Sequence, residues 1–493
     1  MGRSAKIQLC AYVVLASVLL AAHTNADEPT AAQAEVDPAI FDGAVKDYYA
    51  GRYAESAAGF WGYVRFGTPA AEKYEWAQFL LGESLAHLGL WHAATHYYYQ
   101  VAKTRSRPEI LPDALSRLEA ITRFRPFDES MVYDDLLYDS EFGSLPPQLA
   151  DWVQYVQGLY DYRNGYLDWA ERHFNAIRPV SSYAARAQYV RAVHAIKSSR
   201  DDTGIKLLEQ VASNPAAEPK IRNEALLARA RLHFDRGQYQ EALAAYDQVK
   251  QIDLSFEQAQ LMLEKAWAAF KSKDYRKAMG LLHALYAPAY SKYMLPDAYL
   301  LRGLIFKDLC HFIAAKGIVR SFRFALEPTI ASLHRRTPMD KIPVLVEGAR
   351  EQGAMGAIAK VIDALQNERK LIQSFVGPWE DVELDKHLKR LYDLELREQQ
   401  RQWDIGFTRT SDTLALALLD TEEQINLLDY EVGLDIFRRF KHGQASQLRE
   451  ETLTVPYDSS SVYYEFDTEF WNDELHSYSY FINSRCFETG EEP

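Results

Sequence analysis

Residues 223–252 read NEALLARARLHFDRGQYQEALAAYDQVKQI, which is two helix-sized segments joined at Gly237. Ala230 and Ala242 place one small residue in each segment, and two helices that cross at close range need small residues at the crossing. Gly237 readily adopts the left-handed backbone conformation that ends a helix. Tyr246 supplies apolar volume on the face that remains. The stretch therefore predicts a hairpin of two helices that buries its remaining apolar face against a neighbouring hairpin.

The same pattern recurs along the chain before residue 328. The small residue of the second helix recurs at intervals of 38, 76, 34, 38, 36 and 37 residues, a period typical of helical repeats. Because 76 is twice 38, one divergent copy is expected within residues 112–140, around Ala120 and Val132, where Arg125-Pro126-Phe127 interrupts the usual turn. The seven clear positions are Ser56, Ala94, Ala170, Gly204, Ala242, Ala278 and Ala315.

This spacing of small and aromatic residues resembles the tetratricopeptide repeat (TPR). The resemblance implies an all-α fold in which about eight helical hairpins, over residues 39–328, stack into a right-handed superhelical solenoid. The first helix of each hairpin then lines a concave face. The motif is specific for a fold and says little about function.

Residues 329–449 lose the repeat and predict a domain of long helices. Apolar residues at helical spacing predict helices over Val344–Val376, Asp381–Trp403 and Ser411–Phe440, with a break at Gly377-Pro378. Pro328 marks the expected exit from the repeats. Two or three long helices that fold on each other are expected, and a coiled-coil dimer is the alternative.

Residues 450–493 hold 11 acids and one base but also many aromatic side chains. Disordered acidic tails are poor in aromatic residues. We therefore expect a strap that packs its rings onto the helices with its acids outward. The alternation in Ser477-Tyr478-Ser479-Tyr480 is typical of a β-strand. A docking segment for a basic partner is the alternative.

The first 26 residues have the three parts of a secretory signal peptide. Arg3 and Lys6 precede the apolar run Ile7–Ala22, and small residues end at Ala26. An uncleaved membrane anchor is the alternative. Residues 27–38 are expected to be a flexible N-terminal segment, and no later stretch is apolar enough to span a membrane.

The composition of the chain indicates which partners it can bind and in which compartment it is expected to reside. The formal net charge of −14 argues against nucleic-acid binding. The absence of Asn-x-Ser/Thr sequences favours a bacterial periplasm or secretion from a bacterium over a eukaryotic secretory route. Cys310 and Cys486 remain after signal removal and could pair in an oxidising compartment, but the sequence does not show whether they approach each other.

The C-terminal end carries a second resemblance. Val455-Pro456-Tyr457-Asp458, the stretch Phe470–Leu475 and Ser484-Arg485-Cys486 are similar to the closing segment of exported envelope TPR proteins of the myxobacterial gliding-motility type. The resemblance implies a scaffold subunit of an envelope complex and implies no catalysis.

Motifs of catalysis and cofactor binding are missing from the sequence. It contains no P-loop, no dinucleotide-binding glycine fingerprint, no nucleophile elbow and no His-Glu-x-x-His. His92 and His96, four residues apart on a helix, could hold a metal, but no third ligand stands at useful spacing. Asp134-Asp135 and Asp201-Asp202 are interpreted as loop or cap residues. We expect no enzyme activity, no metal and no cofactor, although a distant pair of glycosidase carboxylates stays open.

The expected concave face interleaves aromatic rings with basic residues. Rings give large contacts at low entropic cost, and bases pair with carboxylates of a bound peptide or helix. Some of these rings could instead belong to the repeat core. The candidate partner-binding residues are Trp152, Tyr155, Tyr162, Arg163, Arg186, Tyr189, Arg231, Phe234, Trp267, Phe270 and Lys271.

Two functions fit these observations. The first is a non-enzymatic periplasmic scaffold that binds proteins of a bacterial envelope complex, for gliding motility or envelope transport. The alternative is an envelope protein that binds or cleaves peptidoglycan or another polysaccharide on a helical solenoid. The 31 Tyr and 9 Trp residues motivate the alternative, because sugars stack on such rings.

Overall fold

The computed structural model describes residues 36–138, 141–250, 254–441 and 469–486, and within them the regular structure is entirely helical. The predicted signal peptide and most of segment 27–38 lie outside these residues. The all-α class is therefore confirmed for the described chain. It divides into two compact units, made of Met1–Val190 with Gly353–Ile405 and of Arg191–Gln352 with Gly406–Pro493.

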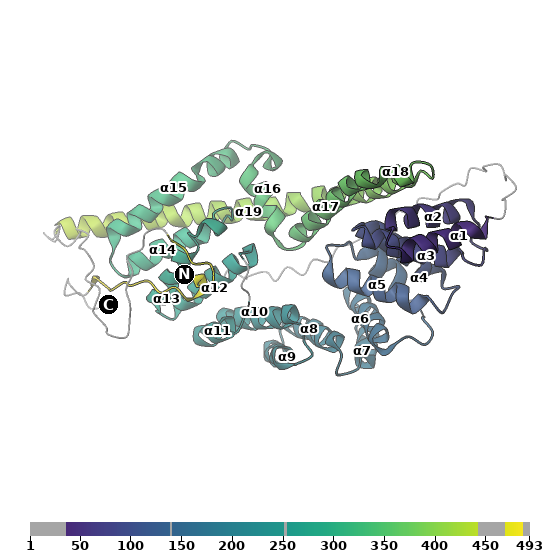
Figure 1. Cartoon of the computed structure of the whole chain (residues 1–493). Coiled ribbons are helices and arrows are strands. Elements are labelled where there is room, and N and C mark those ends of the chain that lie inside the picture. Colours follow the sequence, from purple (N-terminus) through teal and green to yellow (C-terminus); the bar gives the residue numbers. More distant parts are fainter. Residues whose placement is uncertain (1–35, 139–140, 251–253, 442–468, 487–493) are drawn as a thin grey trace. The chain divides into compact units, whose positions relative to one another are not determined.

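Unit 1 begins with helices in sequence order that pack against their neighbours (Figure 1). A hairpin from later in the chain completes it. Its elements are α1 (Pro38–Tyr49), α2 (Tyr53–Phe66), α3 (Tyr74–His87), α4 (Trp91–Thr104), α5 (Leu111–Phe124), the π-helical turn η1 (Met131–Leu137), α6 (Pro147–Arg163), α7 (Leu167–Ala176), α17 (Gly353–Leu371), η4 (Ile372–Phe375) and α18 (Val376–Trp379).

Unit 2 repeats the arrangement of paired helices. Two helices, α8 (Ser182–Lys197) and α19 (Leu384–Lys441), run across the boundary between the units. The elements of unit 2 alone are α9 (Asp201–Ser213), α10 (Pro219–Asp235), α11 (Tyr239–Tyr246), α12 (Phe256–Lys271), α13 (Tyr275–Ala284), η2 (Pro288–Tyr290), α14 (Pro296–Asp308), α15 (Phe312–His334), η3 (Met339–Lys341), α16 (Pro343–Glu351) and η6 (Leu475–Ser477).

The small residues predicted at helix crossings are all buried. At Gly82 an added Cβ would lie 2.8 Å from the ring of Tyr98, and at Gly158 it would lie 2.5 Å from the ring of Phe174. These distances are shorter than any ordinary carbon contact, so each pair of helices approaches as closely as its backbone allows. At Ser56 the close approach also includes a hydrogen bond: the hydroxyl donates to the carbonyl of Ala44, 3.1 Å away on the preceding helix.

The turn inside each clear hairpin has a residue with positive φ, five positions before the crossing residue. Glycine occupies four of these turns, and non-glycine residues accept the unfavourable left-handed conformation in the other three. The same left-handed turn therefore recurs with the same period as the helix crossings, which makes the architecture solenoid-like. The seven turn residues are Gly51, Gly89, Gly165, Ser199, Gly237, Lys273 and Cys310.

The expected divergent copy within residues 112–140 has a normal first helix, α5, but only the π-helical turn η1 in place of the second. Val132, predicted near its crossing, is fully buried. Arg125 has an extended backbone that ends α5, as the following proline requires.

Long helices follow the repeats, with different boundaries from those predicted. Pro328, which was expected to mark the exit from the repeats, lies inside α15, and this helix continues to His334. Proline leaves the carbonyl four residues earlier without a helical partner. The carbonyl in question belongs to Phe324. The side chain of Phe324 is 90% exposed, so this side of the helix faces solvent and water can hydrogen-bond to the carbonyl.

The prediction of a single helix over Val344–Val376 is wrong, because two helices, α16 and α17, occupy this stretch. Gln352 has an extended backbone and Gly353 has positive φ, which together separate α16 from α17. The predicted break at Gly377-Pro378 lies within a longer interruption between Leu371 and Leu384, where η4 and α18 form a compact turn.

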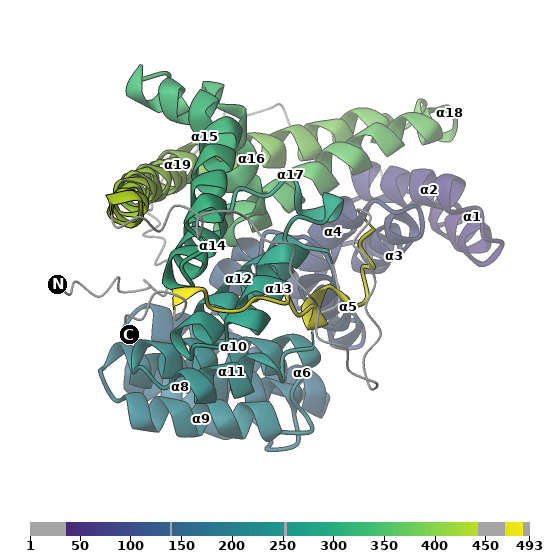
Figure 2. The ribbon, with the colours of Figure 1, turned by 90° about the vertical axis from the view of Figure 1, so that its left-hand side faces the viewer.

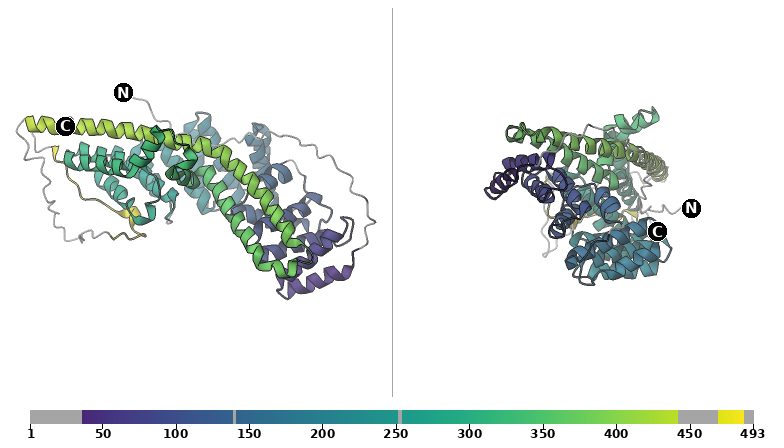
Figure 3. Two further views of the ribbon diagram at one scale, coloured as in Figure 1. Left: turned by 90° about the horizontal axis from the view of Figure 1, so that it is seen from above. Right: turned by 90° about the vertical axis from the view of Figure 1, so that its right-hand side faces the viewer.

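The helices predicted over Asp381–Trp403 and Ser411–Phe440 are one continuous helix, α19, of 58 residues. Only Gly406 weakens the stretch between them, and a glycine costs a helix about 1 kcal/mol, which packing on both sides can offset. Figure 3 shows α17 beside the first part of α19. Arg369 on α17 pairs with Asp393 on α19 at 2.7 Å.

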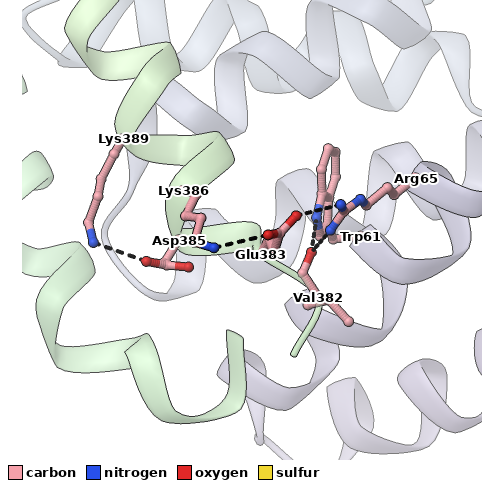
Figure 4. A network of polar contacts seen from close by, with 7 residues as sticks. All are labelled: Trp61, Arg65, Val382, Glu383, Asp385, Lys386 and Lys389. Atoms are coloured by element: carbon pink, nitrogen blue, oxygen red, sulfur yellow. Dashed lines mark hydrogen bonds and ion pairs between the residues drawn. The ribbon is translucent and has the colours of Figure 1, made fainter. Parts of the chain in front are cut away.

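In unit 1, the end of this helical hairpin packs against α2. Trp379 is fully buried and its indole N–H donates to the carbonyl of Ala54 at 2.8 Å. Figure 4 shows the adjoining polar contacts. The Val382 carbonyl accepts from the indole of Trp61 at 2.9 Å and from Arg65 at 2.7 Å, and Arg65 also pairs with Glu383. The indole N–H groups of Trp61 and Trp379 therefore each meet a backbone acceptor across this contact.

Residues 469–486 of unit 2 lie against α13 and α14, and Figure 2 shows this yellow segment crossing α13. The Tyr480 amide donates to the carbonyl of Arg276 at 3.1 Å, and Leu475 and Ile482 are buried. Cys486 forms a disulfide bond with Cys310, with Cα atoms 5.3 Å apart. No strand occurs within residues 469–486, and the rest of the predicted strap lies outside the described residues.

We predict that Trp379→Ala lowers the free energy of unfolding by about 3–5 kcal/mol, because it leaves a cavity and removes the indole hydrogen bond to the Ala54 carbonyl. Urea unfolding followed by circular dichroism at 222 nm measures the loss. Trp471→Ala, which removes a half-exposed indole, is the control and should cost less than about 0.5 kcal/mol. A loss below 1 kcal/mol for Trp379→Ala would contradict this account of the packing.

We predict that Gly280→Ala displaces the C-terminal segment, because its Cβ would lie 1.9 Å from the carbonyl oxygen of Tyr478. The Cys310–Cys486 bond should then be reduced faster by a phosphine reductant, which mass spectrometry of quenched samples follows. Gly317→Ala on α15 is the matched control, since its Cβ would meet no atom within 4 Å. Equal reduction rates in the two variants would refute the close approach.

Candidate functional site

Six of the predicted groove residues lie in unit 1, on α6 and α8. Trp152 is fully buried, so its side chain belongs to the core of the unit. Tyr155 is half-buried and its ring lies 5.5 Å from the ring of Tyr183. Arg186 places its guanidinium 5.3 Å from the centre of the same ring. Half-burial also describes Tyr162 and Tyr189, while Arg163 is exposed.

The other five lie in unit 2, on the neighbouring helices α10 and α12. Arg231 makes two hydrogen bonds of 2.9 Å to Glu264 on α12, and Glu264 also accepts from Tyr246. The positive charge of Arg231 is therefore neutralised by a carboxylate of the same unit. Phe234 packs edge-on against Tyr239, and Trp267 against Phe270, with the exposed Lys271 beside Phe270. The Arg231–Glu264 contact thus ties α10 to α12, the helix that carries Trp267, Phe270 and the exposed Lys271.

A cavity of about 860 Å³ opens in unit 1 beside a different face of α6 from the one that carries Tyr155 and Tyr162. Its α6 residues, Ala150, Val153, Gln154, Gln157 and Asp161, recur at helical spacing, about a third of a turn around the helix from Tyr155 and Tyr162. The segment before α6 and the start of α7 complete the walls. The remaining lining residues are Tyr138, Glu141, Phe142, Gly143, Leu145, Tyr166, Trp169 and His173.

Aromatic rings at the mouth of the cavity are exposed. Tyr166 and Trp169 are 59% and 57% exposed, and the guanidinium of Arg172 lies 4.5 Å from the centre of the Trp169 ring. Exposed indoles and phenols offer flat apolar faces with one polar edge, which suit peptide side chains and sugar rings. We take this cavity, with its rim of Tyr166 and Trp169, as the candidate site.

Polar groups deeper in the cavity hold one another in place. One ring nitrogen of His173 lies 2.8 Å from the amide oxygen of Gln154, and the other lies 3.5 Å from a carboxylate oxygen of Asp161. Burial lowers the pKa of His173, and burial raises the pKa of Asp161. Each shift opposes ionisation, so the pair contributes hydrogen-bonding groups more than strong charge. Such an arrangement orients a bound molecule.

Sequence reasoning missed this cavity because three separate stretches of the chain build it. Tyr138 and residues 141–145 come from the link between the divergent copy and α6, a link that the repeat pattern does not predict. One signal was available. Tyr166 and Trp169 are large aromatic residues beside the crossing residue Ala170, at positions that the hairpin core does not need.

The two histidines considered as metal ligands are partly enclosed by aromatic residues. The ring of His92 packs edge-on against Tyr392, and burial together with the charge of His96 lowers the pKa of His92 to about 4. Burial also lowers the pKa of His96. The described residues contain no cluster of three side chains arranged to hold a metal.

The neighbouring acids also have local partners. Asp135 pairs with Lys103 at 2.8 Å, and Asp202 pairs with Arg236 at 2.8 Å. Both contacts join residues 32 to 34 positions apart, about one repeat along the chain. These acids therefore connect one hairpin to the next.

No model of a known protein family matches this chain, and no characterised protein has a detectably similar sequence. Within the described residues, no helix combines the length and apolar character needed to cross a membrane.

We predict that acidification destabilises unit 1. His92 and His387 both have a pKa of about 4 in the folded chain, below the ordinary value near 6.5 of an unfolded histidine. Between these values the unfolded state binds more protons, so stability is full above pH 7 and falls as the pH drops toward 4. From pH 7 to pH 5, His92 alone should cost about 2 kcal/mol.

Urea unfolding at both pH values, followed by tryptophan fluorescence, tests this, because seven of the nine tryptophans lie in unit 1. His92→Phe should lose clearly less stability on acidification than the unmodified chain. His476→Gln, at an exposed position, should behave like the unmodified chain. Identical acid sensitivity of His92→Phe and the unmodified chain would rule out this histidine as a cause.

Proposed function

We propose that this protein is an exported TPR scaffold that binds protein partners in a bacterial cell envelope and carries out no catalysis. The observation that supports this most is the recurrence of buried small crossing residues and left-handed turns in both units. Repeated hairpins present broad faces rather than one enclosed catalytic cleft, and the usual role of such faces is to bind other proteins. The resemblance to envelope TPR proteins motivates gliding motility or envelope transport as the process served.

Two further observations support export. The N-terminal sequence has the parts of a signal peptide, and Cys310 and Cys486 are joined in a disulfide. Structural disulfides persist in oxidising compartments such as the bacterial periplasm and are rare in the cytosol. We further propose that residues 469–486 are a strap fixed by this bond, with the exposed acids Glu469, Asp473 and Glu474 directed outward.

The cavity of unit 1 supplies a specific binding place. Its exposed Tyr166 and Trp169 can cover apolar side chains of a partner, while the amide group of Gln154, oriented by His173, offers a hydrogen bond to a partner's backbone. In unit 2, Trp267, Phe270 and Lys271 form a second aromatic and basic surface. We propose that each surface contacts a protein partner.

Affinity capture from envelope fractions tests the proposal. Trp169→Ala should reduce recovery of a unit 1 partner at least fivefold, because an exposed aromatic residue of this kind is a typical energetic centre of an interface. Tyr49→Ala is the control, since Tyr49 is 83% exposed in the same unit and away from the cavity lining. Equal recovery with Trp169→Ala and with the unmodified chain would remove the cavity from the proposal.

The cavity also favours the alternative, a protein that binds or cleaves peptidoglycan or another polysaccharide. Indole and phenol faces beside amide and imidazole groups suit sugars as well as peptides. Sedimentation of the purified protein with cell-wall sacculi, and analysis of the supernatant for released fragments, distinguishes the two. Neither cosedimentation nor release is expected for the scaffold, and either result would favour the alternative.

A further inference from the structure

The C-terminal half of α19 has one face that is fixed by its own unit. Ile425, Leu428 and Val432 are buried in the core of unit 2. Asp429 pairs with Lys316 at 2.5 Å and with Arg323 at 3.0 Å, both on α15. These contacts set the rotation of the helix about its axis and therefore determine which side chains point away from the unit.

The opposite face of the same stretch is apolar and exposed. Leu427, Tyr430, Leu434 and Phe437 are 57%, 65%, 36% and 64% exposed. Their spacing of three, four and three residues places them in one line along the helix. We call these four residues the outer seam.

Opposite charges stand at the two ends of the outer seam. Glu423 lies four residues before Leu427, and Lys441 lies four residues after Phe437, both exposed. The six positions 423, 427, 430, 434, 437 and 441 thus continue one heptad pattern, with an acid at one end and a base at the other. When two copies of this helix run in opposite directions, the acid of each therefore lies opposite the base of the other.

We propose that the outer seam binds the outer seam of a second copy of this chain, in an antiparallel two-helix contact. In an antiparallel coiled coil each a position faces a d position of the other helix. Leu427 then packs against the partner's Phe437, and Tyr430 against the partner's Leu434. Glu423 meets the partner's Lys441 at each end of the contact.

The charges select this orientation over the parallel one. A parallel pair would place Glu423 against the partner's Glu423, and Lys441 against the partner's Lys441. Like charges at such positions repel. An antiparallel pair replaces both repulsions with attractions while keeping the apolar contacts.

The size of the seam sets the strength of the contact. Eight partly exposed side chains, four from each copy, bury on the order of 800 Å² in total, the size of a weak, reversible interface. We expect a weak, reversible dimer, which forms when many copies gather in one assembly.

Sedimentation velocity on the full exported chain, from 1 to 200 μM, tests the proposal. The unmodified chain should shift from monomer to dimer over this range. Phe437→Glu should weaken dimerisation at least tenfold. Phe324→Glu, at a position 90% exposed on α15, should leave it unchanged. Circular dichroism at 222 nm checks that both variants keep their helix content.

Charge exchange tests the orientation. Glu423→Lys alone and Lys441→Glu alone should each weaken the dimer, and the double exchange should restore it, because each pair then has opposite charges again. Failure of the double exchange to restore the dimer would overturn the antiparallel arrangement.

Two results would overturn the proposal as a whole. One is a chain that stays monomeric at 200 μM. The other is a dimer that Phe437→Glu does not weaken. Hydroxyl-radical footprinting of a monomeric chain would then show whether Tyr430 and Phe437 are protected by another part of the same chain or are open to solvent.

Discussion

The close crossing of two helices at a small buried residue is the contact on which the rest of this structure depends. At Gly82, Gly158 and Gly204 the neighbouring side chain occupies the place where a Cβ would stand. A larger residue would push the helices apart and open the core of that hairpin. Because the hairpins pack on their neighbours, such a displacement would also disturb the next pair. The aromatic residues beside each crossing can fill the core only while this short separation is kept.

Polar ties reinforce the packing between consecutive hairpins. Arg117 binds Glu83 and Arg231 binds Glu264, each with two hydrogen bonds of 2.9 Å. The partners are separated by 34 and 33 residues, close to one repeat. Bidentate arginine–carboxylate pairs have a demanding geometry, so they fix the position of one hairpin on the next as well as adding stability. The basic residues of the repeats therefore have structural roles that compete with partner binding.

The local features of the hairpins could be predicted from the sequence because they depend on residue size. A crossing requires a small residue, and the spacing of Ser56, Ala94 and their equivalents gave the period. The interruption at Gln352 and Gly353 could not be predicted, since neither residue forbids a helix. The continuity of α19 through Gly406 was missed for the same reason, because packing decides whether one glycine ends a helix.

Contacts between distant parts of the chain were harder to predict. The cysteines were noted, but their pairing depends on a Cα separation that only the fold sets. Arg231 was expected to face a partner, whereas an acid one repeat further on neutralises it. The cavity depends on where the fold places Tyr138 and residues 141–145, and in the sequence only Tyr166 and Trp169 pointed to it. The predicted groove residues fall in both units, and their role in binding stays a prediction.

The disulfide also changes how the chain would respond to mechanical tension. Cys310 and Cys486 are 176 residues apart in the sequence, so their bond closes a covalent ring that contains α15 to α19. A pull on the two ends of the polypeptide would pass from residue 310 through sulfur to residue 486 and bypass everything within the ring. Under such tension the earlier repeats would extend first, while the ring would keep its contour length until a reductant opened it.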